Sequence, residues 1–211
     1  MAISKEQIIH WITSYAAVVH ENKELLTQLD SEIGDADHGA SMDRGFQAVA
    51  QKLPTVAEQD IGAIFKSVGM TLVSTVGGAS GPLYGTLFMQ MSMKAAGLQE
   101  LSLAEFAAAF DTGVKGVVMR GKANPGEKTM IDSLMPAVDA LNAAVANGAT
   151  IATALHDAER SAYKGMLDTI PLIARKGRAS YLGERAIGHQ DPGATSSYLL
   201  VKTAAETLTD A

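Results

Sequence analysis

The strongest chemical signal in the chain is a loop rich in carboxylates. Asp30, Glu32, Asp35 and Asp37 lie within eight residues, and no lysine or arginine accompanies them. Two such charges about 6 Å apart repel by roughly 2–3 kcal/mol at an effective dielectric near ~20. A compact loop therefore favours a bound cation, and carboxylate oxygens without sulfur suit Mg²⁺, Mn²⁺ or Ca²⁺. This acidic loop (residues 29–42) indicates either a metal–phosphate site or a solvated turn that caps the next helix.

The register excludes an EF-hand. Counted from Asp35, its fifth and twelfth positions would be Gly39 and Phe46, which cannot supply the required carboxylates. His38 has no partner at metal-ligand spacing.

Two further segments carry signals for phosphate binding. The glycine-rich loop (residues 76–82) contains GGASGP, whose small residues let a phosphate approach the backbone, although a plain helix–helix turn has the same composition. Residues 121–129 read GKANPGEKT and resemble a P-loop, but Glu127 shifts Lys128 out of register and no strand precedes. We therefore reject a P-loop fold.

A long basic loop (residues 168–193) contains Arg175, Lys176, Arg178 and Arg185 among several glycines. Arginine clamps phosphate with its planar fork, and a glycine-rich loop of this length can close over a ligand. The alternative is a solvated basic loop without a ligand. No G-x-S-x-G element and no nucleophilic triad are present.

Composition restricts the function classes. The 211 residues carry a net charge of −6, which argues against a nucleic-acid binder, and contain no cysteine, which excludes thiolate metal sites and disulfides. No run approaches the roughly 18 apolar residues of a membrane span, and residues 1–6 lack a signal-peptide pattern. We expect a cytoplasmic protein with a single domain over residues 1–211.

Apolar residues recur with helical period along most of the chain, and no convincing strand pattern occurs. Ser4 with Gln7 and Ser102 with Glu105 form predicted capping boxes. Pro136 is expected to kink or break its helix. Eight helices are predicted, and their first residues or caps are Ser4, Asp43, Ile61, Pro82, Ser102, Thr129, Thr150 and Asp191.

Three motifs together resemble the nucleotide-binding L subunit of dihydroxyacetone kinases, and the similarity spans nearly the whole chain. They are EIGDADHG at residues 32–39, GGASGPL at 77–83, and RKGRASYLGER at 175–185 followed by GHQDPGA at 188–194. The resemblance implies an all-α fold, a closed barrel of eight antiparallel helices, with ADP at one end. Two Mg²⁺ ions would bridge its phosphates to Asp30, Asp35 and Asp37.

The resemblance also assigns nucleotide contacts by position. They are His38, Gly39, Ala40, Ser41, Ala79, Ser80, Gly121, Met130, Arg178, Asp191, Pro192 and Gly193. Ser41 departs from the family, in which asparagine is frequent at that position, so the resemblance implies a backbone contact there. No general base is expected on this chain.

The family has two branches, and a separate short L-type chain resembles the branch that uses phosphoenolpyruvate (PEP). ADP is then a permanent coenzyme, phosphorylated in place by an M subunit of the phosphotransferase system, and the phosphoryl group passes to dihydroxyacetone on a K subunit. Alternatives are an ATP-exchanging kinase subunit for dihydroxyacetone or a related small ketose, a Mg²⁺-dependent phosphatase, and a non-catalytic nucleotide-sensing partner. Donor, exact ketose, oligomeric state (a homodimer included) and binding to a transcriptional regulator stay open.

Overall fold

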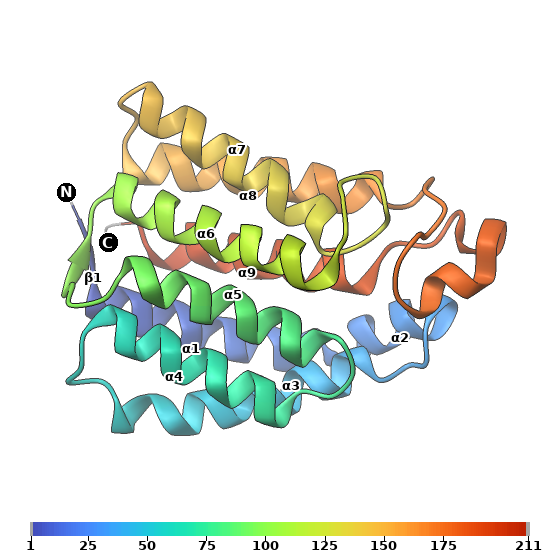
Figure 1. Cartoon of the computed structure of the whole chain (residues 1–211), viewed down its shortest axis with the longest axis horizontal. Helices are drawn as coiled ribbons and strands as arrows, with labels where there is room; N and C mark the ends of the chain where they lie inside the picture. Colours follow the sequence, from blue (N-terminus) through green and yellow to red (C-terminus); the bar gives the residue numbers. More distant parts are fainter. Residues whose placement is uncertain (1, 210–211) are drawn as a thin grey trace.

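The computed structural model describes residues 2–209, and these are predominantly helical (Figure 1). The α-helices are α1 (Lys5–Glu21), α2 (Lys23–Ile33), α3 (His38–Lys52), α4 (Ile61–Thr75), α5 (Ser80–Lys94), α6 (Leu103–Gly121), α7 (Ile131–Ala146), α8 (Ile151–Asp168) and α9 (Pro192–Thr207). Two 3-10 helices are η1 (Leu53–Thr55) and η2 (Arg178–Ala186). A two-residue strand, β1 (Ile3–Ser4), pairs antiparallel with β2 (Glu100–Leu101).

Local capping signals set several helix starts as predicted. The Ser4 hydroxyl accepts a hydrogen bond from the Gln7 amide at 3.2 Å, while the Gln7 side chain accepts one from the Ser4 amide at 2.8 Å. Ser102 and Glu105 form the second box, and Thr150 and Asp191 cap α8 and α9. Each cap satisfies amides that the first turn leaves without a helical partner.

The prediction differs from the structure at two of the N-terminal helices. The sequence did not predict α2, which buries only Leu26, Asp30 and Ile33. Asp43 does not cap a helix, since α3 already begins at His38. Asp43 instead lies within α3 and contacts His20 at 3.0 Å.

Pro136 lies inside α7, which continues from Ile131 to Ala146, so the break that was one of the two expected outcomes does not occur. Its ring nitrogen cannot donate to the carbonyl of Asp132, four residues earlier. Gly165 of α8 packs directly on that carbonyl, because a Cβ at Gly165 would lie 1.9 Å from the oxygen. The neighbouring helix therefore covers the position where the helical hydrogen bond is missing.

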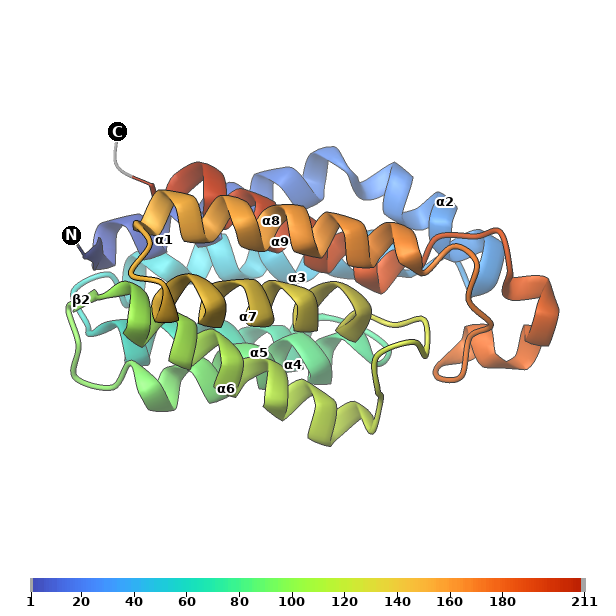
Figure 2. The same ribbon diagram turned by 90° about the horizontal axis from the view of Figure 1, so that it is seen from above.

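Long helices pack side by side around a shared apolar core (Figures 1 and 2). Helices α3 to α9 each contact the next helix, and α1 contacts both α3 and α9. Trp11 packs against Phe65, Phe88 and Phe106 at the centre, and its indole N–H donates to the Leu200 carbonyl at 3.1 Å. Within residues 2–209, no helix combines the length and apolar character needed to cross a membrane.

The connections α2–α3, α4–α5, α6–α7 and α8–α9 all lie at the same end of the molecule, on the right in Figure 1. β1 and the end of α9 lie at the opposite end. The acidic loop, the glycine-rich loop, the 121–129 segment and the basic loop are thereby brought together, although they are distant in sequence.

Candidate functional site

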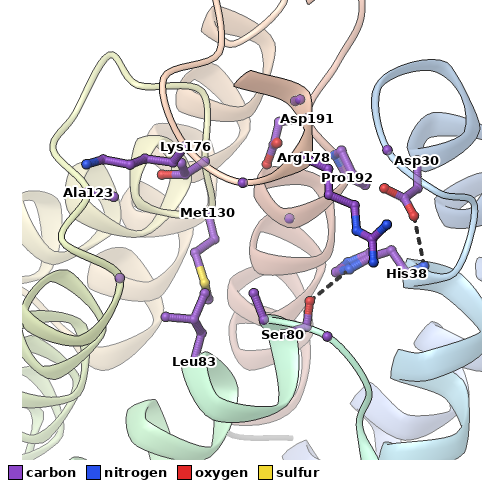
Figure 3. Close-up of a pocket in the computed structure, with 18 of the residues that line it drawn as sticks. Asp30, His38, Ser80, Leu83, Ala123, Met130, Lys176, Arg178, Asp191 and Pro192 are labelled. Carbon is purple, nitrogen blue, oxygen red and sulfur yellow. Dashed lines mark hydrogen bonds between the residues drawn. The ribbon is translucent and has the colours of Figure 1, made fainter. Parts of the chain in front are cut away.

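A cavity of about 390 Å³ lies where these four connections meet (Figure 3). Each connection contributes residues to its wall. Of the residues expected at the site, those that line it are Asp30, Asp35, Asp37, His38, Ala79, Ser80, Gly121, Met130, Arg178, Asp191, Pro192 and Gly193. The fold therefore collects most of the predicted site around one opening.

The N-termini of α3, α5, α7 and α9 converge on this cavity, because the first residues of all four helices line it. The residues directly before α3, α5 and α7 make no side-chain cap, although the first amides of α3 and α7 donate to the side chains of Asp30 and Thr129. The helix dipole places partial positive charge at each N-terminus, and free amides there donate to anions. Four such ends at one cavity suit the phosphates of a nucleotide.

The acidic loop gathers three carboxylates at the rim. Ligand atoms of Asp30, Asp35 and Asp37 all lie within 4.8 Å of one another. Asp30 is buried, and one of its oxygens accepts hydrogen bonds from the amides of Asp37 at 2.8 Å and His38 at 3.1 Å. Those bonds fix the turn that presents all three carboxylates to one point.

Gly34 is sterically required in this turn. A Cβ at Gly34 would lie 2.0 Å from the other Asp30 oxygen, so any side chain would displace that carboxylate. Burial and the neighbouring charges of Asp35 and Asp30 raise the pKa of the Asp37 carboxyl. A cation at this point would relieve that repulsion, and the oxygen-only donor set fits Mg²⁺.

Arg178 reaches the acidic loop from η2. Its guanidinium lies 2.9 Å from the carboxylate of Asp35, and Figure 3 shows the side chain directed toward Asp30 and His38. Lys176 lines the same cavity. Figure 3 shows Lys176 on the side of Ala123 and Met130, so it is Arg178 that supplies positive charge beside the carboxylates.

His38 links three helix N-termini and is not free to bind a metal. Its Nδ1 lies 3.1 Å from the Ser80 hydroxyl, and its Nε2 lies 2.9 Å from the Ser196 hydroxyl (Figure 3). Burial lowers its pKa to about 4, so the imidazole is neutral near pH 7. Tyr84 contacts the same Ser196 hydroxyl at 2.8 Å, which extends this buried polar network into the core.

Asp191 is a buried acid on the cavity wall. One carboxylate oxygen accepts the Ala194 amide at 2.6 Å and so caps α9. Burial, above all, raises the pKa of Asp191 to about 7. The group lies outside the cluster of three carboxylates, so it adds no ligand to that cluster.

The opposite wall of the cavity is largely apolar, with Lys176 beside it (Figure 3). Met130 points toward Leu83, with Ala123 nearby (Figure 3), and Val117 and Gly121 continue the surface. A flat, uncharged ring suits such a surface, because apolar contacts with few polar groups are typical of small-molecule pockets. The cavity thus has a charged end and an apolar end.

Three predicted contact residues do not line the cavity: Gly39, Ala40 and Ser41. Gly39 faces α2, where a Cβ would lie 2.1 Å from the Lys23 carbonyl oxygen, so the glycine allows α2 and α3 to pack closely. Ala40 is exposed. The Ser41 hydroxyl accepts a hydrogen bond from Arg44 at 3.2 Å.

Sequence reasoning missed Lys128, which it treated only as part of a failed P-loop motif. The side chain is buried, and its ammonium nitrogen lies within hydrogen-bond distance of five backbone carbonyls of the basic loop. Leu83, Ala123 and Lys176 were also not assigned to the site. Lys128 stands out only because a lysine is buried there, and burial of that kind cannot be read from residue types.

Comparisons with known proteins agree with this geometry. A DAK2 domain model matches residues 32–206. The chain is 48% identical over 202 residues to the ADP-binding subunit DhaL of the PEP-dependent dihydroxyacetone kinase of Escherichia coli (strain K12), a match that covers 96% of each chain. It is 42% identical over 198 residues to the ADP-binding subunit DhaL of the PTS-dependent dihydroxyacetone kinase of Lactococcus lactis, covering 94% of this chain and 95% of that one.

A solved structure has the same fold. The dihydroxyacetone kinase from C. freundii in complex with AMP-PNP and Mg²⁺ superposes with a TM-score of 0.72 at 25% identity, covering 94% of this chain and 33% of that one. With the domain match and the full-length similarity, the chain belongs to the DAK2-domain family, among the ADP-binding DhaL subunits of dihydroxyacetone kinases.

Proposed function

We propose that this chain is the ADP-binding subunit of a PEP-dependent dihydroxyacetone kinase. ADP stays bound, is phosphorylated in place by an M subunit of the phosphotransferase system, and passes the phosphoryl group to dihydroxyacetone held on a K subunit. One observation carries the proposal: three clustered carboxylates and Arg178 stand at the cavity on which four helix N-termini converge. That arrangement suits a metal–phosphate complex better than either group alone.

Asp30, Asp35 and Asp37 would hold two Mg²⁺ ions. The fit rests on the oxygen-only donor set and on the mutual repulsion of the three carboxylates. When bound, Mg²⁺ neutralises phosphate charge and aligns the donor with the acceptor. The protein's own groups would do the remaining work, which is binding and orientation.

The chain's residues have separate roles in this proposal. Arg178 and the helix N-termini hold phosphate oxygens, and the neutral His38 keeps the starts of α3, α5 and α9 in register. Met130, with the apolar wall beside it, holds the adenine, and Asp191, Pro192 and Gly193 cover the nucleotide. The chain contributes no general base, since substrate activation belongs to the K subunit.

The same proposal covers architecture and setting. The eight long helices α1 and α3 to α9 form a closed barrel, supported by the return contact between α9 and α1. The whole chain acts as one nucleotide-binding domain in the cytoplasm. It transfers phosphoryl groups only with its partner subunits.

An ATP-exchanging kinase for dihydroxyacetone or a related ketose is the second candidate. It is favoured by the similarity to the C. freundii kinase, whose complex contains AMP-PNP, a non-hydrolysable ATP analogue. That kinase is a longer chain, of which this one covers 33%. The 48% identity to the DhaL subunit of the PEP-dependent kinase of Escherichia coli, over 96% of each chain, favours the PEP-dependent reading.

Reconstitution distinguishes these candidates. The purified chain is combined with K-type and M-type subunits, the general phosphotransferase proteins and either PEP or ATP, and dihydroxyacetone phosphate is measured. The proposal predicts product from PEP only in the complete mixture, and none from ATP with the isolated chain. Product from ATP without an M subunit would establish the second candidate. No product from either donor would leave a nucleotide-sensing role.

A further inference from the structure

Lys128 is an unusual residue in this fold. It is 1% exposed and lies in the connection between α6 and α7. Its backbone has a φ of +60°, in the left-handed region that favours glycine. A long charged side chain is thus held inside the protein on a strained backbone. Such a placement requires strong partners, because an unpaired buried ammonium is very unfavourable.

The partners are all backbone carbonyls of the basic loop. The ammonium donates to the carbonyl oxygens of Thr169 at 2.8 Å, Ala186 at 2.8 Å and His189 at 2.5 Å. Those of Leu172 and Ile170 lie at 3.2 and 3.4 Å. An ammonium has three protons, so the three short contacts use them fully and the two longer ones add electrostatic attraction. The coordination resembles that of a bound monovalent cation.

These carbonyls come from both ends of the basic loop. Thr169, Ile170 and Leu172 follow α8, whereas Ala186 and His189 precede α9. The Gly188 amide also donates to the Ile170 carbonyl at 2.8 Å, and this hydrogen bond joins the same two ends of the basic loop. Lys128 therefore ties together the two ends of the segment 169–189, which carries Arg178 and precedes Asp191.

The neighbouring residue Glu127 reinforces this attachment. Its carbonyl accepts the Arg175 amide at 3.0 Å, and its carboxylate lies 3.9 Å from the Lys176 ammonium. The 121–129 segment thus docks on the basic loop at two points, and the basic loop reaches the acidic loop through Arg178 and Asp35.

We propose that Lys128 is a positioning residue: its ammonium acts as a built-in cation that gathers five carbonyls and holds the basic loop over the nucleotide cavity. The expected effect of Lys128 on ADP retention rests on the proposed function. The expected effect of Lys128 on the basic loop does not, because the carbonyl contacts exist without any ligand.

The test removes the ammonium without adding backbone strain. Lys128→Gly suits the positive φ, so a defect in this variant reflects the lost side chain. Lys122→Gly is the matched control, because Lys122 is exposed and also has a positive φ, +49°. Trypsin cleavage after the exposed basic residues between 175 and 185 is measured in EDTA without nucleotide, and ADP retention is measured separately.

Lys128→Gly is expected to be cleaved at least about tenfold faster than the control, since a lost hydrogen bond to a charged group is worth that factor or more. Propylammonium, which offers N–H donors, should restore protection and ADP retention. Tetramethylammonium, which has the charge but no N–H, should not. Cleavage equal to that of Lys122→Gly, or equal rescue by both cations, would overturn the proposal.

A measurement on the wild-type chain covers the case in which Lys128→Gly does not fold. Nitrogen-15 labelling of lysine should show one ammonium signal that exchanges slowly with water at neutral pH, because all three of its protons are bonded and buried. Absence of such a signal would contradict the proposal. If wild-type protein shows the slow ammonium and the protected loop but retains no ADP, the proposed function fails while the role of Lys128 in the loop stands.

Discussion

The guanidinium of Arg178 lies 2.9 Å from the carboxylate of Asp35, which joins the basic loop to the acidic loop. The arginine side chain is 67% exposed, and exposed ion pairs contribute only about 0–1 kcal/mol to stability. The pair therefore matters less for the stability of the fold than for the place it gives to a positive charge beside the carboxylates.

Arg178→Ala should lower ADP affinity by about tenfold, equivalent to roughly 1.4 kcal/mol, because a charge-assisted contact to phosphate is lost. Its melting temperature without nucleotide should stay close to wild type. Arg185→Ala is the control, since Arg185 lies on the same 3-10 helix and, within residues 2–209, donates only to the Leu182 carbonyl at 3.4 Å. Calorimetric titration with ADP and Mg²⁺ measures both. Equal affinities for the two variants would assign the basic loop no role in binding.

Asp37→Asn should change stability in opposite directions with and without ligand. In the wild-type chain the pKa of the Asp37 carboxyl is raised by folding. The stability that this group contributes is therefore present below its unfolded pKa and is lost as the pH rises through its folded pKa. At pH 7 without ligand, the variant should gain a few tenths of a kcal/mol, because the group is well exposed. With Mg²⁺ and ADP it should lose most of the roughly 2.7 kcal/mol that a ligand at about 100 times its Kd provides.

Thermal melts in EDTA and in Mg²⁺–ADP measure these two effects. Asp139→Asn, an exposed change on α7 away from the cavity, should leave both melts unchanged. If Asp37→Asn keeps the full ligand-induced shift, Asp37 is not a metal ligand.

The buried carboxyl of Asp191 should make the ligand-free protein less stable as the pH rises from 3.8 toward about 7, because the raised folded pKa means that ionisation costs more in the folded state. His38 acts in the opposite direction, since its lowered pKa means that stability is lost as the pH falls toward about 4. Asp191→Asn keeps an oxygen to cap α9 and removes the ionisation. The difference between wild-type and variant unfolding free energies should therefore shrink at low pH. A difference independent of pH would contradict this assignment.

The acidic loop and the cap at Asp191 could be recognised from the sequence because their signals are local, whereas the individual nucleotide contacts were expected only from the family resemblance. The spacing of the carboxylates in the acidic loop indicates a cation site, and Asp191 before Pro192 indicates a helix start, from neighbouring residues alone. The start of α3 was misplaced because Asp43 is a good cap by type, yet its carboxylate pairs with His20 and Lys23 from neighbouring helices. Tertiary contacts decided between two roles that the residue type allows equally.

The sequence could not predict the role of Lys128. Its acceptors are backbone carbonyls of Thr169, Ala186 and His189, which every residue type has, and they are 41 to 61 positions away. Gly39 is a related case, in which a glycine inside a recognised motif serves the packing of α2 on α3. Neither role changes the local pattern of residue types.

A chase experiment shows whether ADP remains on the chain as a coenzyme through many turnovers. The chain is loaded with radiolabelled ADP and Mg²⁺, and many turnovers are run from PEP with partner subunits and excess unlabelled ADP. The label should stay with the protein while dihydroxyacetone phosphate accumulates. Loss of the label within a few turnovers, with product still formed, would contradict it.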